Sequence, residues 1–176
     1  MGKLALRGLV LTVVIGLLGL GSYAIASGGT KNFKGSPLNG YAEVPSVSSV
    51  GTGSFEARLS NDSTSLDYEL SYSGLEGTVT GAAHVHLGQT AVNGGVSFFL
   101  CGGGGRPACT PTEGVFTGTV TAADVIGPAG QGIAAGQFDE IVAAMRAGRA
   151  YANVHSTKWP GGEIRAQINN RGEADD

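Results

Sequence analysis

Alternation of apolar and polar residues is the clearest pattern in the middle of the chain. In the segment SLDYELSYS, residues 65–73, the polar positions alternate with Leu66, Tyr68, Leu70 and Tyr72. Successive side chains of a strand point to opposite faces, so a period of two predicts a strand with one buried face. The segment 53–60 has a similar pattern, and the turn-forming residues NDST separate the two. We therefore expect a β-hairpin here.

Other segments extend this β-rich pattern, and one segment has a helical period. Five stretches are bounded by glycine or turn residues and are expected to be strands, at 77–88, 95–101, 114–125, 150–156 and 162–168. Between residues 137 and 148 the apolar residues have the i, i+3, i+4, i+7 spacing of one helix face: Phe138, Ile141, Val142 and Met145. Six to eight antiparallel strands with one short helix predict an all-β fold, a sandwich or a barrel.

Composition supports this fold class and bounds the size of the domain. Glycine contributes 31 of 176 residues, well above its usual share of about 7%, and charged residues contribute 14%. This balance favours short strands joined by tight turns over a helical bundle. The length suits one domain. We expect a signal peptide or anchor at 1–26, a linker at 27–37, the folded domain at 38–168 and a polar tail at 169–176.

The first 26 residues have the layout of a secretory signal peptide. Lys3 and Arg7 precede an apolar run, and Ala24 and Ala26 form the A-x-A pattern of a cleavage site. The alternative is an uncleaved anchor, because the stretch 9–26 has about the length of a membrane helix. Both alternatives predict a secreted, periplasmic or cell-envelope protein, which meets the membrane only if this segment is retained.

Charge and motifs exclude several classes of function. The formal net charge is −3 and no basic run is present, so the electrostatic footprint of a nucleic-acid binder is missing. The chain has no GxSxG or HExxH motif, and its CGGGG run lacks the GK[ST] ending of a phosphate loop. In an exported protein, Cys101 and Cys109 are expected to form a disulfide rather than a metal or redox site.

All three histidines of the chain lie in two predicted strands. His84 and His86 are two residues apart, so they share one strand face, while the opposite face carries Ala83, Val85 and Leu87. The same parity puts His155 on the polar face of its strand. If the two strands are neighbours, three imidazoles could bind one metal and leave a position open. Imidazole suits copper and zinc, and copper binds most tightly among the divalent ions.

Simpler interpretations stand beside these. The histidines can be partly exposed residues that hydrogen-bond to their neighbours. In the last strand, Glu163 and Arg165 share a face. The simpler interpretation of this pair is an exposed ion pair that keeps an edge strand soluble. The functional one is that Arg165 draws an anion to the metal.

Several motifs, in a consistent order, resemble the CHRD (chordin-type) domain. They are LNGYAEVPSV, GLEGTVTGAAHVHLG, VSFFLC, GVFTGTVTAADV and YANVHSTKWPGGEIRAQI, and they cover 38–168. The resemblance implies an exported protein, and it implies no common activity. For an exported protein, we expect any partner to be extracellular or in the cell envelope. The cysteine-rich modules that bind growth factors in chordin have no counterpart in this chain, so that activity is not carried over.

A weaker resemblance is to copper/zinc superoxide dismutases. The residues that match that family's copper-ligand segments and its guiding arginine are Gly74, Leu75, Gly77, His84, Val85, His86, Val154, His155 and Arg165. The resemblance implies an immunoglobulin-like or Greek-key antiparallel β-sandwich with a three-histidine copper site and Arg165 as a catalytic residue. The chain lacks a fourth, bridging histidine and the zinc-binding loop, so a zinc site of that family is not expected.

These observations favour an exported β-sandwich that acts as a binding or structural module, with copper as the candidate cofactor at the three histidines. The alternative is a copper-dependent enzyme similar to superoxide dismutase, or a copper-handling protein. Non-enzymatic function is the preferred expectation, because only the histidines and one arginine support catalysis.

Overall fold

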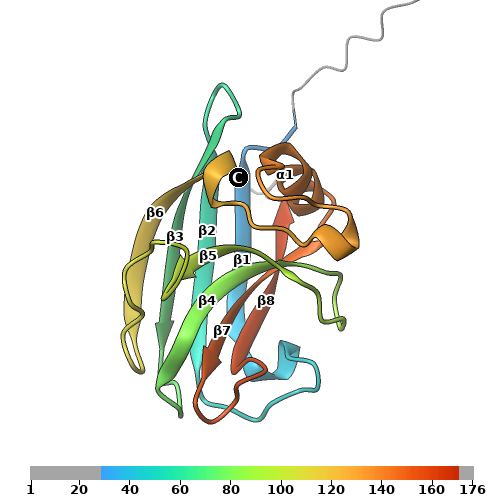
Figure 1. Cartoon of the computed structure of the whole chain (residues 1–176). Helices are drawn as coiled ribbons and strands as arrows, with labels where there is room; N and C mark the ends of the chain where they lie inside the picture. Colours follow the sequence, from blue (N-terminus) through green and yellow to red (C-terminus); the bar gives the residue numbers. More distant parts are fainter. Residues whose placement is uncertain (1–28, 171–176) are drawn as a thin grey trace, which may run out of the picture.

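The computed structural model describes residues 29–170, where the chain forms eight strands, one α-helix and three short 3-10 helices (Figure 1). The expected signal peptide or anchor at 1–26 lies outside the described residues. The elements are β1 (Asn32–Asn39), η1 (Gly40–Ala42), β2 (Thr52–Leu59), β3 (Ser65–Ser73), β4 (Val79–Leu87), β5 (Val96–Cys101), β6 (Gly114–Thr121), η2 (Ala122–Asp124), η3 (Ala129–Gln131), α1 (Phe138–Arg146), β7 (Ala150–Ser156) and β8 (Ile164–Asn170). No helix in this range has the length and apolar character that a membrane span requires.

These strands form one antiparallel sheet in the order β5-β4-β7-β8-β1-β2-β3-β6. The consecutive strands β4 and β5 pair, but β7 returns to pair with β4, and β6 returns to pair with β3. Such returns are Greek-key connections. The sheet curls so that its two halves face each other across the apolar core (Figure 1). The predicted all-β, Greek-key sandwich with one short helix is confirmed.

The buried face of β3 shows how the sequence pattern produces the core. Leu66, Tyr68, Leu70 and Tyr72 are each at most 5% exposed, as their alternation predicts. The buried hydroxyl of Tyr68 donates a hydrogen bond to the carbonyl oxygen of Leu100 at 2.7 Å, so its polar atom is satisfied. Burying one large apolar side chain stabilises a fold by about 1.5 to 3 kcal/mol.

Helix α1 follows the predicted period and packs across one end of the sheet (Figure 1). Its buried residues are Phe138, Ile141, Val142 and Met145. Acidic residues lie in its first turn and Arg146 in its last, which complements the helix dipole. Gly148 follows the helix with a φ of +64°, a left-handed conformation that favours glycine.

Strand β1 is the main departure from expectation, because 27–37 is expected to be a linker. From Asn32 the chain instead pairs with β2 on one side and β8 on the other. Phe33 and Leu38 anchor it, at 2% and 0% exposure. A register shift between Gly35 and Leu38 breaks the alternation that would reveal a strand. The linker prediction is therefore wrong from Asn32 onwards. Strand β8 likewise extends to Asn170, two residues into the expected tail.

The cysteine pair forms the expected disulfide, between Cys101 and Cys109. The segment that it closes contains Arg106, which donates a hydrogen bond to the carbonyl oxygen of Thr119 at 2.8 Å. Arg106 also forms an ion pair with Asp124 at 3.0 Å. Because β6 is the last strand in the sheet order, this contact places the closed segment against the outer edge of β6.

Candidate metal centre

The three histidines meet on one face of the sheet because β4 and β7 are neighbours. In their antiparallel register His84 pairs with Asn153 and His86 pairs with Tyr151. The ring of His84 lies 5.4 Å from that of His86 and 5.2 Å from that of His155, between ring centres. One potential ligand atom from each histidine lies within 4.8 Å of the other two. The structure thus brings together the residues that the sequence selects.

Hydrogen bonds determine which nitrogen of two of these rings is available. Nδ1 of His86 lies 3.0 Å from the carbonyl oxygen of Gly94, and Nδ1 of His155 lies 2.9 Å from that of Pro160. A carbonyl oxygen can only accept, so each Nδ1 carries the proton and donates it. The Nε2 lone pair of both rings is therefore free, which is how histidines are oriented at metal sites.

Three ring nitrogens of this cluster are buried without a hydrogen-bond partner. They are Nδ1 of His84, Nε2 of His86 and Nε2 of His155. Leaving a buried acceptor unpaired costs about 1 to 3 kcal/mol. These are also the nitrogens that a metal would need, so the donor set fits an ion that prefers imidazole.

Burial keeps the imidazoles neutral. Burial, together with a smaller effect of the neighbouring His155 and His86, lowers the pKa of His84 to about 3. It lowers the pKa of His86 to about 4, although the hydrogen bond to Gly94 opposes the change. The pKa of His155 is also lowered by burial. Near pH 7 all three lone pairs are therefore available to a metal rather than to protons.

Aromatic rings surround the cluster. Phe99 of β5 contacts His84 edge-on, with ring centres 4.7 Å apart. Tyr151 stacks on His86, with ring centres 4.8 Å apart and planes inclined by 5°. Within the described range, the residues grouped around a common ligand position are the three histidines, without a carboxylate or a cysteine. This is an all-nitrogen donor set flanked by two aromatic rings.

Glu163 and Arg165 are not an exposed pair on an edge strand. Their exposed fractions are 0% and 1%, and β8 lies between β7 and β1. Glu163 accepts hydrogen bonds from the hydroxyl of Ser49 and the backbone N–H of Glu76, both at 2.7 Å. The exposed-pair prediction is wrong because it took β8 for an edge, and the missed strand β1 covers that edge.

Arg165 contacts the ring of Tyr151, on which His86 stacks. Its guanidinium carbon lies 3.4 Å from the centre of the Tyr151 ring, and β7 carries this ring between β4 and β8. The guanidinium donates to the carbonyl oxygens of Gln89 at 3.0 Å and Val92 at 2.9 Å. Because the side chain is buried, this geometry gives no support to the expected catalytic role of Arg165 in drawing an anion from solvent.

The family model of the CHRD domain matches residues 35–168, which include the histidines, the disulfide and Arg165. The chain belongs to the CHRD domain family. No curated protein and no solved structure matches this CHRD domain at a significant level.

Two residues beside the centre of this CHRD domain escaped the sequence analysis. Glu43 is 5% exposed, and burial raises its pKa to about 7, while the charge of Arg165 opposes the rise. Asn153 is 2% exposed and is the neighbour of both His84 and Arg165 in the sheet register. Glu43 follows a short 3-10 helix, where no periodic pattern marks it. Asn153 could have been found, because it shares the polar face of β7 with His155.

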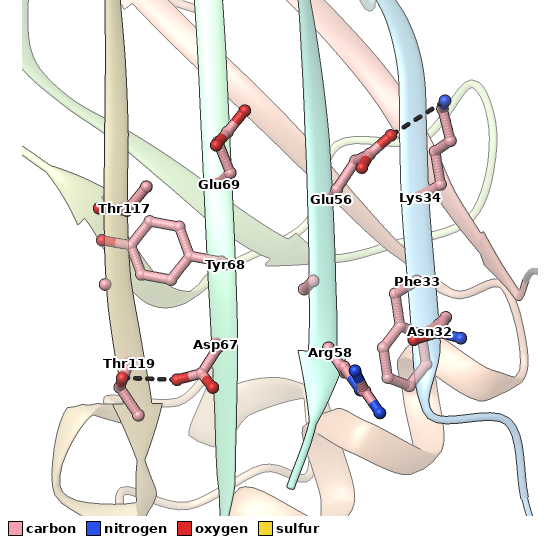
Figure 2. Close-up of a pocket in the computed structure, with 12 residues that line it drawn as sticks. Asn32, Phe33, Lys34, Glu56, Arg58, Asp67, Tyr68, Glu69, Thr117 and Thr119 are labelled. Carbon is pink, nitrogen blue, oxygen red and sulfur yellow. Dashed lines mark hydrogen bonds and ion pairs between the residues drawn. The ribbon is translucent and has the colours of Figure 1, made fainter.

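The outer face of β1, β2, β3 and β6 carries a groove of about 690 Å³ that sequence analysis did not single out (Figure 2). Lys34 and Glu56 form an ion pair across it at 3.0 Å. The hydroxyl of Thr119 donates to Asp67 at 2.6 Å. These charged and polar groups satisfy one another, and no histidine lines the groove, so the three-histidine cluster is the stronger candidate site.

Proposed function

We propose that this CHRD domain is an exported β-sandwich module that binds one copper ion through His84, His86 and His155. Two observations carry the proposal: a ligand atom of each histidine lies within 4.8 Å of those of the other two, and each ring has a buried nitrogen without a hydrogen-bond partner. One ion at their common centre would satisfy all three at once. Copper is favoured over the other divalent ions because it forms the most stable complexes with nitrogen ligands.

The surrounding residues have separate tasks in such a site. The carbonyl oxygens of Gly94 and Pro160 hold the protons of two imidazoles and fix their orientation. Phe99 and Tyr151 pack against the rings and restrict water. Bound copper would supply a redox-active Lewis acid. The histidines would bind it, and the carbonyl oxygens and aromatic rings would keep the histidines in place.

Export is the second part of the proposal. Disulfides persist in oxidising compartments, and this domain contains one between Cys101 and Cys109. The signal layout of residues 1–26 supports the same compartment. CHRD domains are extracellular or secreted modules, so a partner in the envelope or outside the cell fits this proposal, and a membrane contact would need the N-terminal segment to be retained.

Metal titration of the purified protein tests the proposal. Wild-type protein is titrated with Cu(II) and with Zn(II) beside a variant that carries His84→Ala, His86→Ala and His155→Ala. We expect wild type to bind one copper, and at a free concentration of 100 times Kd the bound ion adds about 2.7 kcal/mol of stability. Glu69→Gln, on the opposite half of the sheet, is the control and should bind as wild type does. Equal behaviour of wild type and the triple variant would reject the site.

A superoxide dismutase-like activity is the alternative, favoured by the match of His84, His86 and His155 to the copper ligands of that family. It needs an open coordination position and a route for a small anion. Superoxide decay is measured with copper-loaded wild type, the triple variant and the same copper in buffer. Decay above that of free copper would make the protein an enzyme. Tight copper binding without turnover would instead indicate storage or delivery.

A further inference from the structure

Arg165 is the largest fully buried side chain among the described residues, and its position calls for an explanation. Burying a charge is costly unless hydrogen bonds compensate for the lost water. Here the hydrogen bonds go to one short segment: the guanidinium donates to the carbonyl oxygens of Gln89 and Val92, and lies 3.5 Å from Oδ1 of Asn93. Arg165 therefore holds the segment 89–94 in place through hydrogen bonds to its residues Gln89, Val92 and Asn93.

The same segment ends at the residue that orients His86. The carbonyl oxygen of Gly94 accepts the Nδ1 proton of His86 at 3.0 Å. The backbone N–H of Gly94 donates to the hydroxyl of Tyr151, also at 3.0 Å. A Cβ at Gly94 would lie 1.6 Å from the carbonyl oxygen of Leu87, so the chain passes β4 too closely for any other residue.

Tyr151 connects the two ends of this arrangement. The guanidinium of Arg165 lies over its ring and the ring of His86 stacks on it. A cation over an aromatic ring is attracted by it, so Arg165 also holds the ring in place. Arg165 thus acts on His86 by two routes, through segment 89–94 and through Tyr151.

We propose that Arg165 is a positioning residue for the metal centre. By holding segment 89–94 it keeps the carbonyl oxygen of Gly94 where it receives the proton of His86 Nδ1, which leaves Nε2 unprotonated and facing His84 and His155. The part of this proposal that concerns copper binding rests on the proposed function. The effect on the His86 tautomer does not, because that tautomer exists in the metal-free protein.

The first test is the tautomer of His86 in the metal-free protein, measured by ¹⁵N NMR of the ring nitrogens. We expect wild type to carry the proton on Nδ1 and Arg165→Met to populate both tautomers. Gln167→Met is the matched control. Gln167 lies two residues further along β8 and donates to the carbonyl oxygens of Gly88, Gly148 and Ala150, but to none within 89–94. It should keep the wild-type tautomer.

The second test is a double-mutant cycle on copper affinity. Outer partners of metal-bound histidines usually contribute 10- to 100-fold, so we expect Arg165→Met to weaken copper binding by about tenfold. In a His86→Ala background it should cause no further loss, because the ligand that it positions is gone. A purely structural effect of Arg165 would persist in that background.

The outcomes separate the two proposals. If Arg165→Met lowers the melting temperature but leaves the tautomer of His86 unchanged, the positioning role is overturned. If wild type binds no copper while Arg165→Met still mixes the tautomers, the positioning role stands and the copper proposal fails. If Arg165→Met does not fold, Arg165→Lys replaces it. Lysine keeps the charge but not the planar fork, so a fully wild-type tautomer in that variant would overturn the proposal.

Discussion

Each imidazole of the cluster is held neutral by its surroundings, and this has a cost at acid pH. The folded-state pKa of His84 is lowered to about 3 and that of His86 to about 4, against 6.5 for the ordinary group. Below about pH 6.5 the unfolded chain takes up protons that the folded chain refuses. The stability that the neutral imidazoles contribute is therefore complete above that pH and falls progressively towards pH 3.

Denaturant unfolding of the metal-free protein at pH 8, 6 and 4.5 checks this dependence. Glu43, whose pKa burial raises to about 7, has the opposite effect on stability: it becomes charged in a buried position as the pH rises, which lowers stability. The comparison is therefore with the triple histidine-to-alanine variant, in which the contribution of Glu43 is retained. We expect the stability of wild type relative to that variant to fall by more than 1 kcal/mol from pH 8 to pH 4.5. A constant difference would mean that the imidazoles are more hydrated than this geometry implies.

At the residue scale the sequence predicts most of the cluster. The parity of two strands places His84, His86 and His155 on polar faces, and the neighbouring strands then bring them together. Which nitrogen of each ring is free could not be predicted, because it depends on the carbonyl oxygens of Gly94 and Pro160. Both belong to turns whose geometry leaves no periodic trace.

The segment after β4 is the element on which the centre depends most. We expect Gly94→Ala to destabilise the protein by about 1 to 3 kcal/mol, because its Cβ would collide with the carbonyl oxygen of Leu87. The same change should disturb the tautomer of His86. Thermal unfolding together with ¹⁵N NMR checks both effects.

Gly130→Ala is the control for that prediction. No atom lies within 4 Å of a Cβ built at Gly130, so its replacement should change stability by less than about 0.5 kcal/mol. If the two alanine variants unfold at the same temperature, the segment around Gly94 can relax, and it cannot act as a rigid support.

The sequence predicts an element correctly where a regular period marks one buried face. It does not predict a strand such as β1, which is recognised only by its pairing with β2 and β8. β3 and α1 have regular periods and could be placed directly from the sequence. β1 could not, since its polar composition and the irregularity between Gly35 and Leu38 hide two anchoring residues. Because β1 is not predicted, β8 is taken for an edge strand. For the same reason Glu163 and Arg165 are expected to be exposed, although both are buried.

For the whole molecule, the disulfide should add a modest increment of stability. Closing the short loop between Cys101 and Cys109 is expected to contribute about 2 to 3 kcal/mol in the chain-entropy description. Melting curves with and without reductant measure it, with a Cys101→Ser, Cys109→Ser variant to exclude effects of the reductant elsewhere. An unchanged melting temperature would show that the loop keeps its structure without the covalent link.

The segment closed by the disulfide also affects whether the edge of β6 can pair with a strand of another molecule. The outer edge of β6 offers backbone groups on which a foreign strand could form, and such edges seed aggregation. Arg106 occupies one of these groups by donating to the carbonyl oxygen of Thr119. Reduction would loosen this cover and leave the edge open to strand addition. We therefore expect the disulfide to support solubility in addition to thermal stability.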